Sequence, residues 1–152
     1  MHYFKDKYEH LARNVDLFKG LGLDEIVKIM SYGLTRTLDP DSVIFEKGQL
    51  GTEMYVILEG QVQIVDEGNP VALLGPGDMF GEMAVMGGAR RSASAVTTEI
   101  TNLFVLSEDR LHKLLTKRIA ITMLWNVIGT LSQRLAAAND KIKRLQSGGP
   151  LI

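Results

Sequence analysis

The chain has 152 residues, 45% of them hydrophobic, and a formal net charge of −1, which suits one globular domain with a single core. A charge so near zero gives no overall field that would attract nucleic acid or a membrane. The absence of cysteine excludes disulfides, thiolate zinc sites and cysteine nucleophiles. No signal peptide and no apolar run of about 20 residues is present, so we expect a cytoplasmic protein without a membrane span.

Residues 1–33 predict a helical lead-in. Tyr8, Leu11 and Val15 lie about one helical turn apart, and residues 24–30 predict a second, N-capped helix that ends at Gly33.

Residues 34–107 change to a pattern of short apolar runs punctuated by glycine. Many short strands with glycine turns are typical of a sandwich or barrel, and connections too short for crossover helices favour antiparallel pairing. The runs that predict strands are 43–45, 54–58, 62–65, 71–74 and 103–106.

Residues 108–146 return to helix. Ser107 is a candidate N-cap, with Glu108 and Asp109 in the first turn, where the helix dipole favours anions. A short helix then carries Leu111, Leu114 and Leu115, a long helix follows, and residues 147–152 predict a frayed tail. Residues 108–152 hold eight Lys or Arg against three acids, which is typical of a solvated helix face and less so of a nucleic-acid contact.

The long helix has apolar residues at alternating spacings of three and four, which is a heptad seam. The seam residues are Ile121, Leu124, Ile128, Leu131, Leu135, Ala138, Ile142 and Leu145. We predict a homodimer through this seam; the alternative is a helix packed only on its own domain. Met123, Trp125 and Val127 add apolar surface beside the seam, so one helix would face both its own sheet and a second copy.

The stretch 75–93 is dense in glycine and small residues and lies between strand-like runs. A short helix over 81–86 would offer free amides to an anion. Arg91 would add a charge-assisted contact to that anion, and Glu82 would accept a hydrogen bond from a sugar hydroxyl. The alternative is that the glycines only make turns and that Glu82 and Arg91 form a surface salt bridge.

This stretch resembles the phosphate-binding cassette of the cyclic nucleotide-binding domain family. The resemblance rests on Phe-Gly-Glu-Met-Ala at 80–84 and Arg-Ser-Ala at 91–93, and it extends over about residues 15–146. Further matching segments are 17–21, 43–48, 55–60 and 76–78. The resemblance implies one domain that is mainly β with flanking helices. An antiparallel β-roll (a jelly-roll barrel) over 34–107, with its cassette at 80–93, would lie between the N-terminal helices and a long C-terminal helix that serves as cap and dimer seam.

The same resemblance implies a role for each matched residue. Glu82 should accept the ribose 2′-hydroxyl, and Arg91 should pair with the cyclic phosphate. The remaining phosphate contacts should come from Gly81, Met83, Ala84 and the Ser92 hydroxyl, and the apolar contacts from Ile64 and Val71.

In the bacterial catabolite activator branch of the family, the long helix caps the base, and residues 133–139 resemble that cap. The branch has a Thr-Ser pair at the positions of Ala138 and Asn139; the amide of Asn139 can donate to or accept from either purine. Arg134 either reaches toward Glu82 or is an exposed helix charge.

These features predict a cAMP-binding regulatory or sensor domain, with cGMP as the alternative ligand, coupled to its C-terminal helix. A cofactor, metal site or catalytic activity is not expected, because His2, His10 and His112 lie outside the predicted barrel and no nucleophile-elbow or Walker motif is present. Direct DNA binding is not expected, because the seven residues after Leu145 cannot form a helix-turn-helix.

Two other interpretations remain open. The chain is either a dimeric interaction scaffold with a degenerate pocket, or a regulatory piece of a larger kinase, channel or transcription system. The downstream effector is not predicted.

Overall fold

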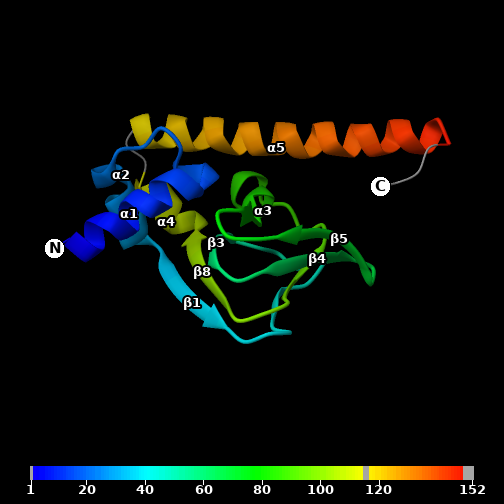
Figure 1. Ribbon diagram of the computed structural model, residues 1–152, viewed down its shortest axis with the longest axis horizontal. Coiled ribbons are helices and arrows are strands. Elements are labelled where there is room, and N and C mark those ends of the chain that lie inside the picture. Colours follow the sequence, from blue (N-terminus) through cyan, green and yellow to red (C-terminus); the bar gives the residue numbers. More distant parts are fainter. Residues whose placement is uncertain (1, 115–116, 149–152) are drawn as a thin grey trace.

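A computed structural model describes residues 2–114 and 117–148 (Figure 1). Two four-stranded antiparallel sheets form a β-roll, with strand orders β1-β8-β3-β6 and β2-β7-β4-β5. The strands are β1 (Leu34–Leu38), β2 (Val43–Phe45), β3 (Glu53–Glu59), β4 (Val62–Asp66), β5 (Asn69–Leu74), β6 (Met79–Phe80), β7 (Ser94–Thr97) and β8 (Thr101–Ser107).

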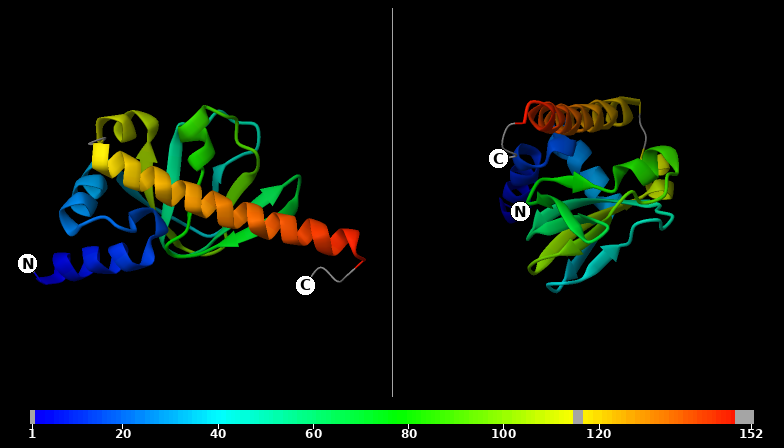
Figure 2. Two further views of the ribbon diagram at one scale, coloured as in Figure 1. Left: turned by 90° about the horizontal axis from the view of Figure 1, so that it is seen from above. Right: turned by 90° about the vertical axis from the view of Figure 1, so that its right-hand side faces the viewer.

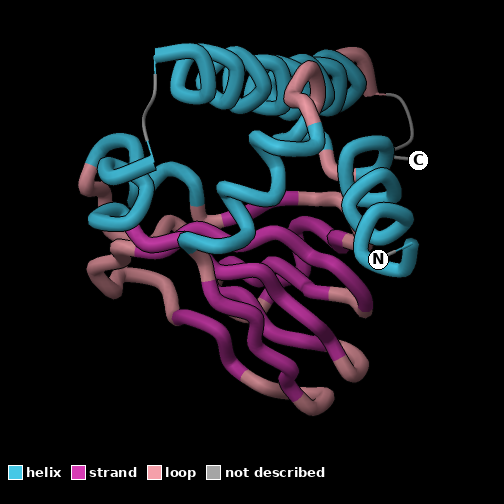
Figure 3. The backbone as a smooth tube through the Cα atoms, turned by 90° about the vertical axis from the view of Figure 1, so that its left-hand side faces the viewer, coloured by secondary structure: helices cyan, strands magenta, loops and turns pink. Residues whose placement is uncertain are grey.

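Helices cover one side of the strands, as Figure 3 shows. They are α1 (His2–Asn14), the 3₁₀ helix η1 (Asp16–Phe18), α2 (Leu23–Tyr32), α3 (Glu82–Gly87), α4 (Glu108–Leu114) and α5 (Lys117–Gln146). The predicted fold class is confirmed: an antiparallel β-roll with N-terminal helices and a long C-terminal helix. Of the sequence predictions, Leu115 and residues 149–152 lie outside the described residues.

All five predicted strands are present, and the structure adds three that the sequence did not reveal. Strand β1 has exposed threonines and an arginine, β6 has two residues, and β7 consists largely of small side chains. None of the three has the apolar run by which a buried strand is recognised.

Strands β3 and β8 are buried on both faces, which explains their continuous apolar runs. Because side chains alternate across a strand, Met54 and Phe104 face the helices, whereas Tyr55 and Leu103 face the opposite sheet. The roll therefore has an inner core between its sheets and a second core beneath its helices. The inner core consists of Tyr55, Ile57, Val62, Phe80, Ala95, Leu103 and Val105.

Helix α5 runs the length of the molecule, above α3 and β5 (Figures 1 and 2). Its first half is anchored: Ile119, Met123 and Val127 are buried at four-residue spacing. The Asn126 amide also donates to the carbonyl oxygens of Leu17, at 2.7 Å, and of Lys19. Every residue from 131 to 146 is exposed, so the second half projects over the roll without a buried side chain.

Candidate functional site

A cavity of about 460 Å³ lies between the β-roll, α3 and the second half of α5. Its volume falls within the range of small-molecule sites. All the residues that the sequence predicted for the site line it, except Asn139, which is exposed on α5. The lining residues are Phe45, Ile64, Val71, Ala72, Leu74, Phe80, Gly81, Glu82, Met83, Ala84, Arg90, Arg91, Ser92, Ala93, Arg134, Ala137, Ala138 and Lys141.

Gly81 begins the cassette in the left-handed region, with φ +77°. A Cβ at this position would lie 2.8 Å from Nη1 of Arg91 and 3.2 Å from the carbonyl oxygen of Glu53. Both the backbone conformation and the close approach therefore require glycine. Helix α3 starts at the next residue, and the amides of its first turn have no partner within the helix.

Arg91 lies in the floor of the cavity and is only 6% exposed. Its Nη1 donates to the carbonyl oxygen of Gly81 at 3.0 Å, and its Nη2 donates to that of Glu53 at 2.7 Å. Its Cζ lies 4.1 Å from the centroid of the Phe45 ring, in cation–π geometry. The guanidinium is thus fixed by two backbone carbonyls and one aromatic face.

The environment of Arg91 leaves its charge incompletely compensated. Burial lowers the pKa of Arg91, while Tyr55, Glu53 and Glu82 nearby act in the opposite direction. Its Nε is buried without a hydrogen-bond partner among the described residues, and a Cβ on Gly51 would lie 2.2 Å from that atom. An arginine remains charged under these conditions, and a buried cation is stabilised by an anion.

Beneath Arg91 three aromatic rings form a shelf, composed of Phe45, Tyr55 and Phe80. Tyr55 and Phe80 are stacked with centroids 5.0 Å apart, and Phe45 lies about 6 Å from both. The Tyr55 hydroxyl donates to Oε2 of Glu53 at 2.9 Å. Burial, followed by this hydrogen bond, raises the pKa of Tyr55 to about 12. Sequence reasoning missed this shelf, because aromatic residues in strands resemble ordinary core.

Glu82 is 4% exposed and accepts a hydrogen bond from Nη1 of Arg134 at 2.9 Å. Arg134 also donates through Nη2 to the carbonyl oxygen of Met79. The sequence left two roles open for Arg134, and in the structure its side chain reaches Glu82. The surface salt bridge between Glu82 and Arg91 is absent: both side chains are buried, and each has other partners.

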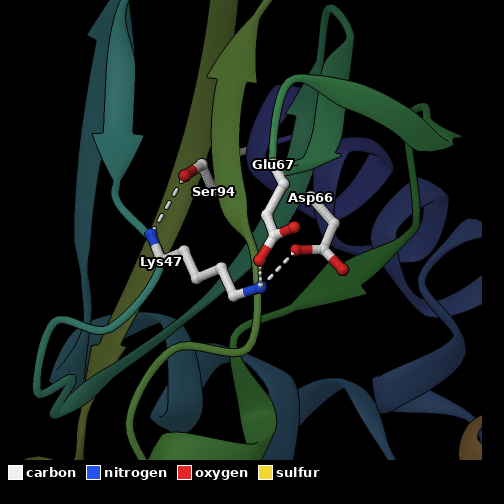
Figure 4. Close-up of polar contacts among 4 residues, drawn as sticks. All are labelled: Lys47, Asp66, Glu67 and Ser94. Atoms are coloured by element: carbon white, nitrogen blue, oxygen red, sulfur yellow. Dashed lines mark hydrogen bonds and ion pairs between the residues drawn. The ribbon is translucent and has the colours of Figure 1, made fainter.

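Outside the cavity lining, Lys47 joins segments that are distant in the sequence (Figure 4). Its Nζ lies 2.6 Å from Oδ1 of Asp66 and 3.2 Å from Oε1 of Glu67, and its backbone amide donates to Oγ of Ser94 at 2.9 Å. The hydrogen bonds to the two carboxylates raise the pKa of Lys47. The contacts join the loop after Phe45 to the β4–β5 turn, but they are exposed and therefore weak.

The cavity lining has a cationic excess beside its apolar strand residues. It contains Arg90, Arg91, Arg134 and Lys141 but a single carboxylate, that of Glu82. Such a lining suits an anionic ligand with an apolar part. Within residues 2–114 and 117–148 no three His, Asp or Glu side chains are grouped as metal ligands, and no helix is long and apolar enough to cross a membrane.

Comparison with known proteins identifies relatives of this site and fold. The family model of the cyclic nucleotide-binding domain matches residues 35–118. The chain is 36% identical over 135 residues to the cyclic AMP receptor protein of Thermus thermophilus, covering 85% of this chain and 61% of the receptor. It is 30% identical over 144 residues to the human cyclic nucleotide-gated channel beta-1, covering 91% of this chain and 11% of the channel.

Solved structures agree with these matches. A cyclic nucleotide-binding domain from Methylobacillus flagellatus superposes with a TM-score of 0.81 at 27% identity, covering 99% of this chain and 88% of that one. The catabolite activator protein of Thermus thermophilus gives a TM-score of 0.75 at 33% identity, with coverages of 86% and 63%. The chain thus spans about three fifths of the receptor and one ninth of the channel.

Proposed function

Because the chain belongs to the cyclic nucleotide-binding domain family, we propose that its cavity binds a cyclic nucleotide monophosphate and that the domain regulates a partner and is not an enzyme. One observation carries the proposal: a buried arginine and a buried glutamate line the same cavity. A phosphate would neutralise the first, and a ribose hydroxyl would donate to the second.

In this proposal Arg91 pairs with the phosphate, together with the Ser92 hydroxyl and the backbone amides of Gly81, Met83 and Ala84. Glu82 keeps its bond to Arg134 and accepts the ribose 2′-hydroxyl with a remaining lone pair. The apolar side chains of Ile64 and Val71, which line the cavity from β4 and β5, cover the sugar and the base.

The relatives do not agree on one base. One relative is named a cyclic AMP receptor protein, while a solved structure with a TM-score of 0.66 at 26% identity belongs to a cyclic-GMP-dependent signalling pathway. The sequence favours cAMP, with cGMP as the alternative. The cytoplasmic location and the absence of direct DNA binding likewise remain predictions.

Ligand binding is coupled to α5 in this proposal, because Arg134 joins the helix to the glutamate that would hold the ribose. A ligand shifts a conformational equilibrium only through different affinities for its two states. Hydrogen exchange of residues 118–146, measured with and without ligand, tests the coupling. We expect slower exchange in the second half of α5 when ligand is bound; unchanged exchange would exclude the coupling.

We also propose that two copies pair through the heptad seam of α5. Seven of its apolar side chains are between 37% and 63% exposed in the single chain: Ile121, Leu124, Ile128, Leu131, Leu135, Ile142 and Leu145. Ala138 lines the cavity instead. A Leu131→Glu variant puts a charge in the seam and should sediment as a monomer; a dimer of unchanged mass would place the interface elsewhere.

The decisive experiment is calorimetric titration with cAMP and, separately, with cGMP. We expect micromolar or tighter binding to at least one of them. Arg91→Ala should weaken binding by about 2–4 kcal/mol, on the order of 30- to 1,000-fold. Arg91→Lys keeps the positive charge at this position. An unchanged melting temperature of a variant shows that its loss of binding does not come from unfolding. Binding of neither nucleotide by the wild type would favour the scaffold with a degenerate pocket.

A further inference from the structure

The charge of the cavity is opposite in sign to that of the rest of the chain. Its lining has four cations and the single carboxylate of Glu82, a local charge of +3. Since the lining carries +3 and the whole chain has a formal net charge of −1, the residues outside the lining together carry −4. An anionic ligand is therefore attracted where the cavity opens and weakly repelled by the remaining surface.

The four cations of the lining differ in their exposure to solvent. Arg91 is buried, and Arg134 is partly exposed and pairs with Glu82. Arg90 and Lys141 are exposed although both line the cavity, so they lie at its mouth. They come from different elements: Arg90 from the segment between α3 and β7, and Lys141 from α5.

The charges of these two residues at the mouth are not neutralised. Arg90 donates through Nη1 to the carbonyl oxygen of Gly48 at 2.9 Å, which is a neutral acceptor. Lys141 has no hydrogen bond or ion pair with any of the described residues. Its neighbour Asp140 is exposed and does not line the cavity. Both carboxylates of the β4–β5 turn are bound by Lys47, which reduces their repulsion of an anion.

Charges of one sign at the mouth of a cavity with low-dielectric walls raise the local concentration of an oppositely charged ligand. Charges at the rim of a site act mainly on the association rate, whereas buried hydrogen-bonded charges act on the dissociation rate. We propose that Arg90 and Lys141 attract the nucleotide phosphate from solution and speed its entry, and that they do not hold the ligand once it has reached Arg91. This inference rests on the proposed function.

The test is stopped-flow mixing with a fluorescent derivative of the cyclic nucleotide that the wild type binds. Displacement by excess unlabelled nucleotide gives the dissociation rate. At an ionic strength of about 0.01 M the Debye length is about 30 Å. Under this condition Arg90→Gln and Lys141→Gln should each associate on the order of three- to tenfold more slowly than the wild type, with unchanged dissociation. At about 1 M salt, where the Debye length is about 3 Å, both variants should associate as the wild type does.

Two further variants separate the charge of Arg90 from its hydrogen bond and from the net charge of the protein. Arg90→Lys keeps the charge but not the guanidinium that binds Gly48, and it should keep the association rate of the wild type. Lys28→Gln removes an exposed cation of α2 that does not line the cavity. It changes the net charge by the same amount as Arg90→Gln and should associate nearly as fast as the wild type.

Three outcomes would overturn the assignment. Faster dissociation of Arg90→Gln at an unchanged association rate would show that Arg90 holds the bound ligand. Equal slowing in Lys28→Gln would show that net charge matters and position does not, and a wild-type association rate independent of salt would exclude attraction by charge. All three require binding and leave the proposed function intact, whereas binding of neither cAMP nor cGMP by the wild type would remove both proposals.

Discussion

The floor and the lid of the cavity are held in contrasting ways. On the floor, Arg91 is buried, donates to two backbone carbonyls and lies on the ring of Phe45. The lid, residues 131–146 of α5, is exposed at every position and reaches the roll through Arg134. The first half of the same helix is anchored, with Met123 and Val127 in the core.

Under the proposed function, this contrast would separate recognition of the ligand from the response to it. A guanidinium already fixed before binding loses little conformational freedom when an anion arrives, which favours affinity. Elements with few buried contacts open at low free-energy cost and are the ones that move in regulation. We infer that the floor supplies most of the affinity for the phosphate, and that the lid converts occupancy into a change that a partner can detect.

The two halves of α5 should differ most in their effect on stability. Met123→Ala removes a buried side chain and should lower the free energy of unfolding by about 2–5 kcal/mol. The neighbouring Leu124 is 46% exposed. Replacing it by alanine should lower the free energy of unfolding by less than about 0.5 kcal/mol. Urea unfolding at low protein concentration, where association does not contribute, measures both values. Equal losses would mean that α5 packs with a different face.

Removing the contact of the lid should release its half of the helix. Arg134→Met deletes the bonds to Glu82 and Met79. The side chain of Arg134 is 40% exposed. Solvent screening therefore limits the free energy by which these bonds stabilise the lid to about 1–2 kcal/mol. Amides of residues 131–146 should then exchange on the order of tenfold faster, while those of 119–127 keep their protection. Lys143→Met is the matched control, and equal exchange in both variants would show that Arg134 does not hold the lid.

The floor can be disturbed without touching Arg91 itself. Gly51→Ala places a methyl group where the guanidinium now lies, so Arg91 must shift away from the two carbonyls. We expect on the order of tenfold weaker binding of cyclic nucleotide, about 1.4 kcal/mol. A Cβ on Gly75 meets no atom within 4 Å, so Gly75→Ala should bind as the wild type does. Equal affinities of the two variants would show that the position of Arg91 adapts freely.

Local patterns in the sequence were enough to predict the cassette and most of the strands, because glycine turns and apolar runs extend over only a few residues. They did not reveal what holds Arg91. Phe45 and Gly51 lie 46 and 40 positions before it in the chain, and only the pairing of β2 with β7 and the folding of the β2–β3 loop bring them to its side chain.

The lid illustrates a second limit of the sequence. The heptad spacing predicted a helix with two faces, and the structure has a buried face at Ile119, Met123 and Val127. The spacing does not fix the rotation of the helix about its axis over the cavity. In the structure Ala138 and Lys141 line the cavity and Asn139 does not, and this orientation depends on side-chain contacts such as that of Arg134 with Glu82.

The smallest predicted effect concerns the shelf under Arg91 and its dependence on pH. The folded protein holds Tyr55 protonated, with a pKa of about 12 against an ordinary value of 10.0. A group whose pKa is raised by folding stabilises the protein fully below its unfolded pKa, and that stability is lost as the pH rises toward the folded pKa. The contribution of Tyr55 should therefore fall by about 1 kcal/mol between pH 9 and pH 11. Tyr55→Phe has no such proton to lose, so its unfolding free energy should decline less steeply over this range. Parallel alkaline declines of the two proteins, measured by urea unfolding, would show that folding does not raise the pKa of Tyr55.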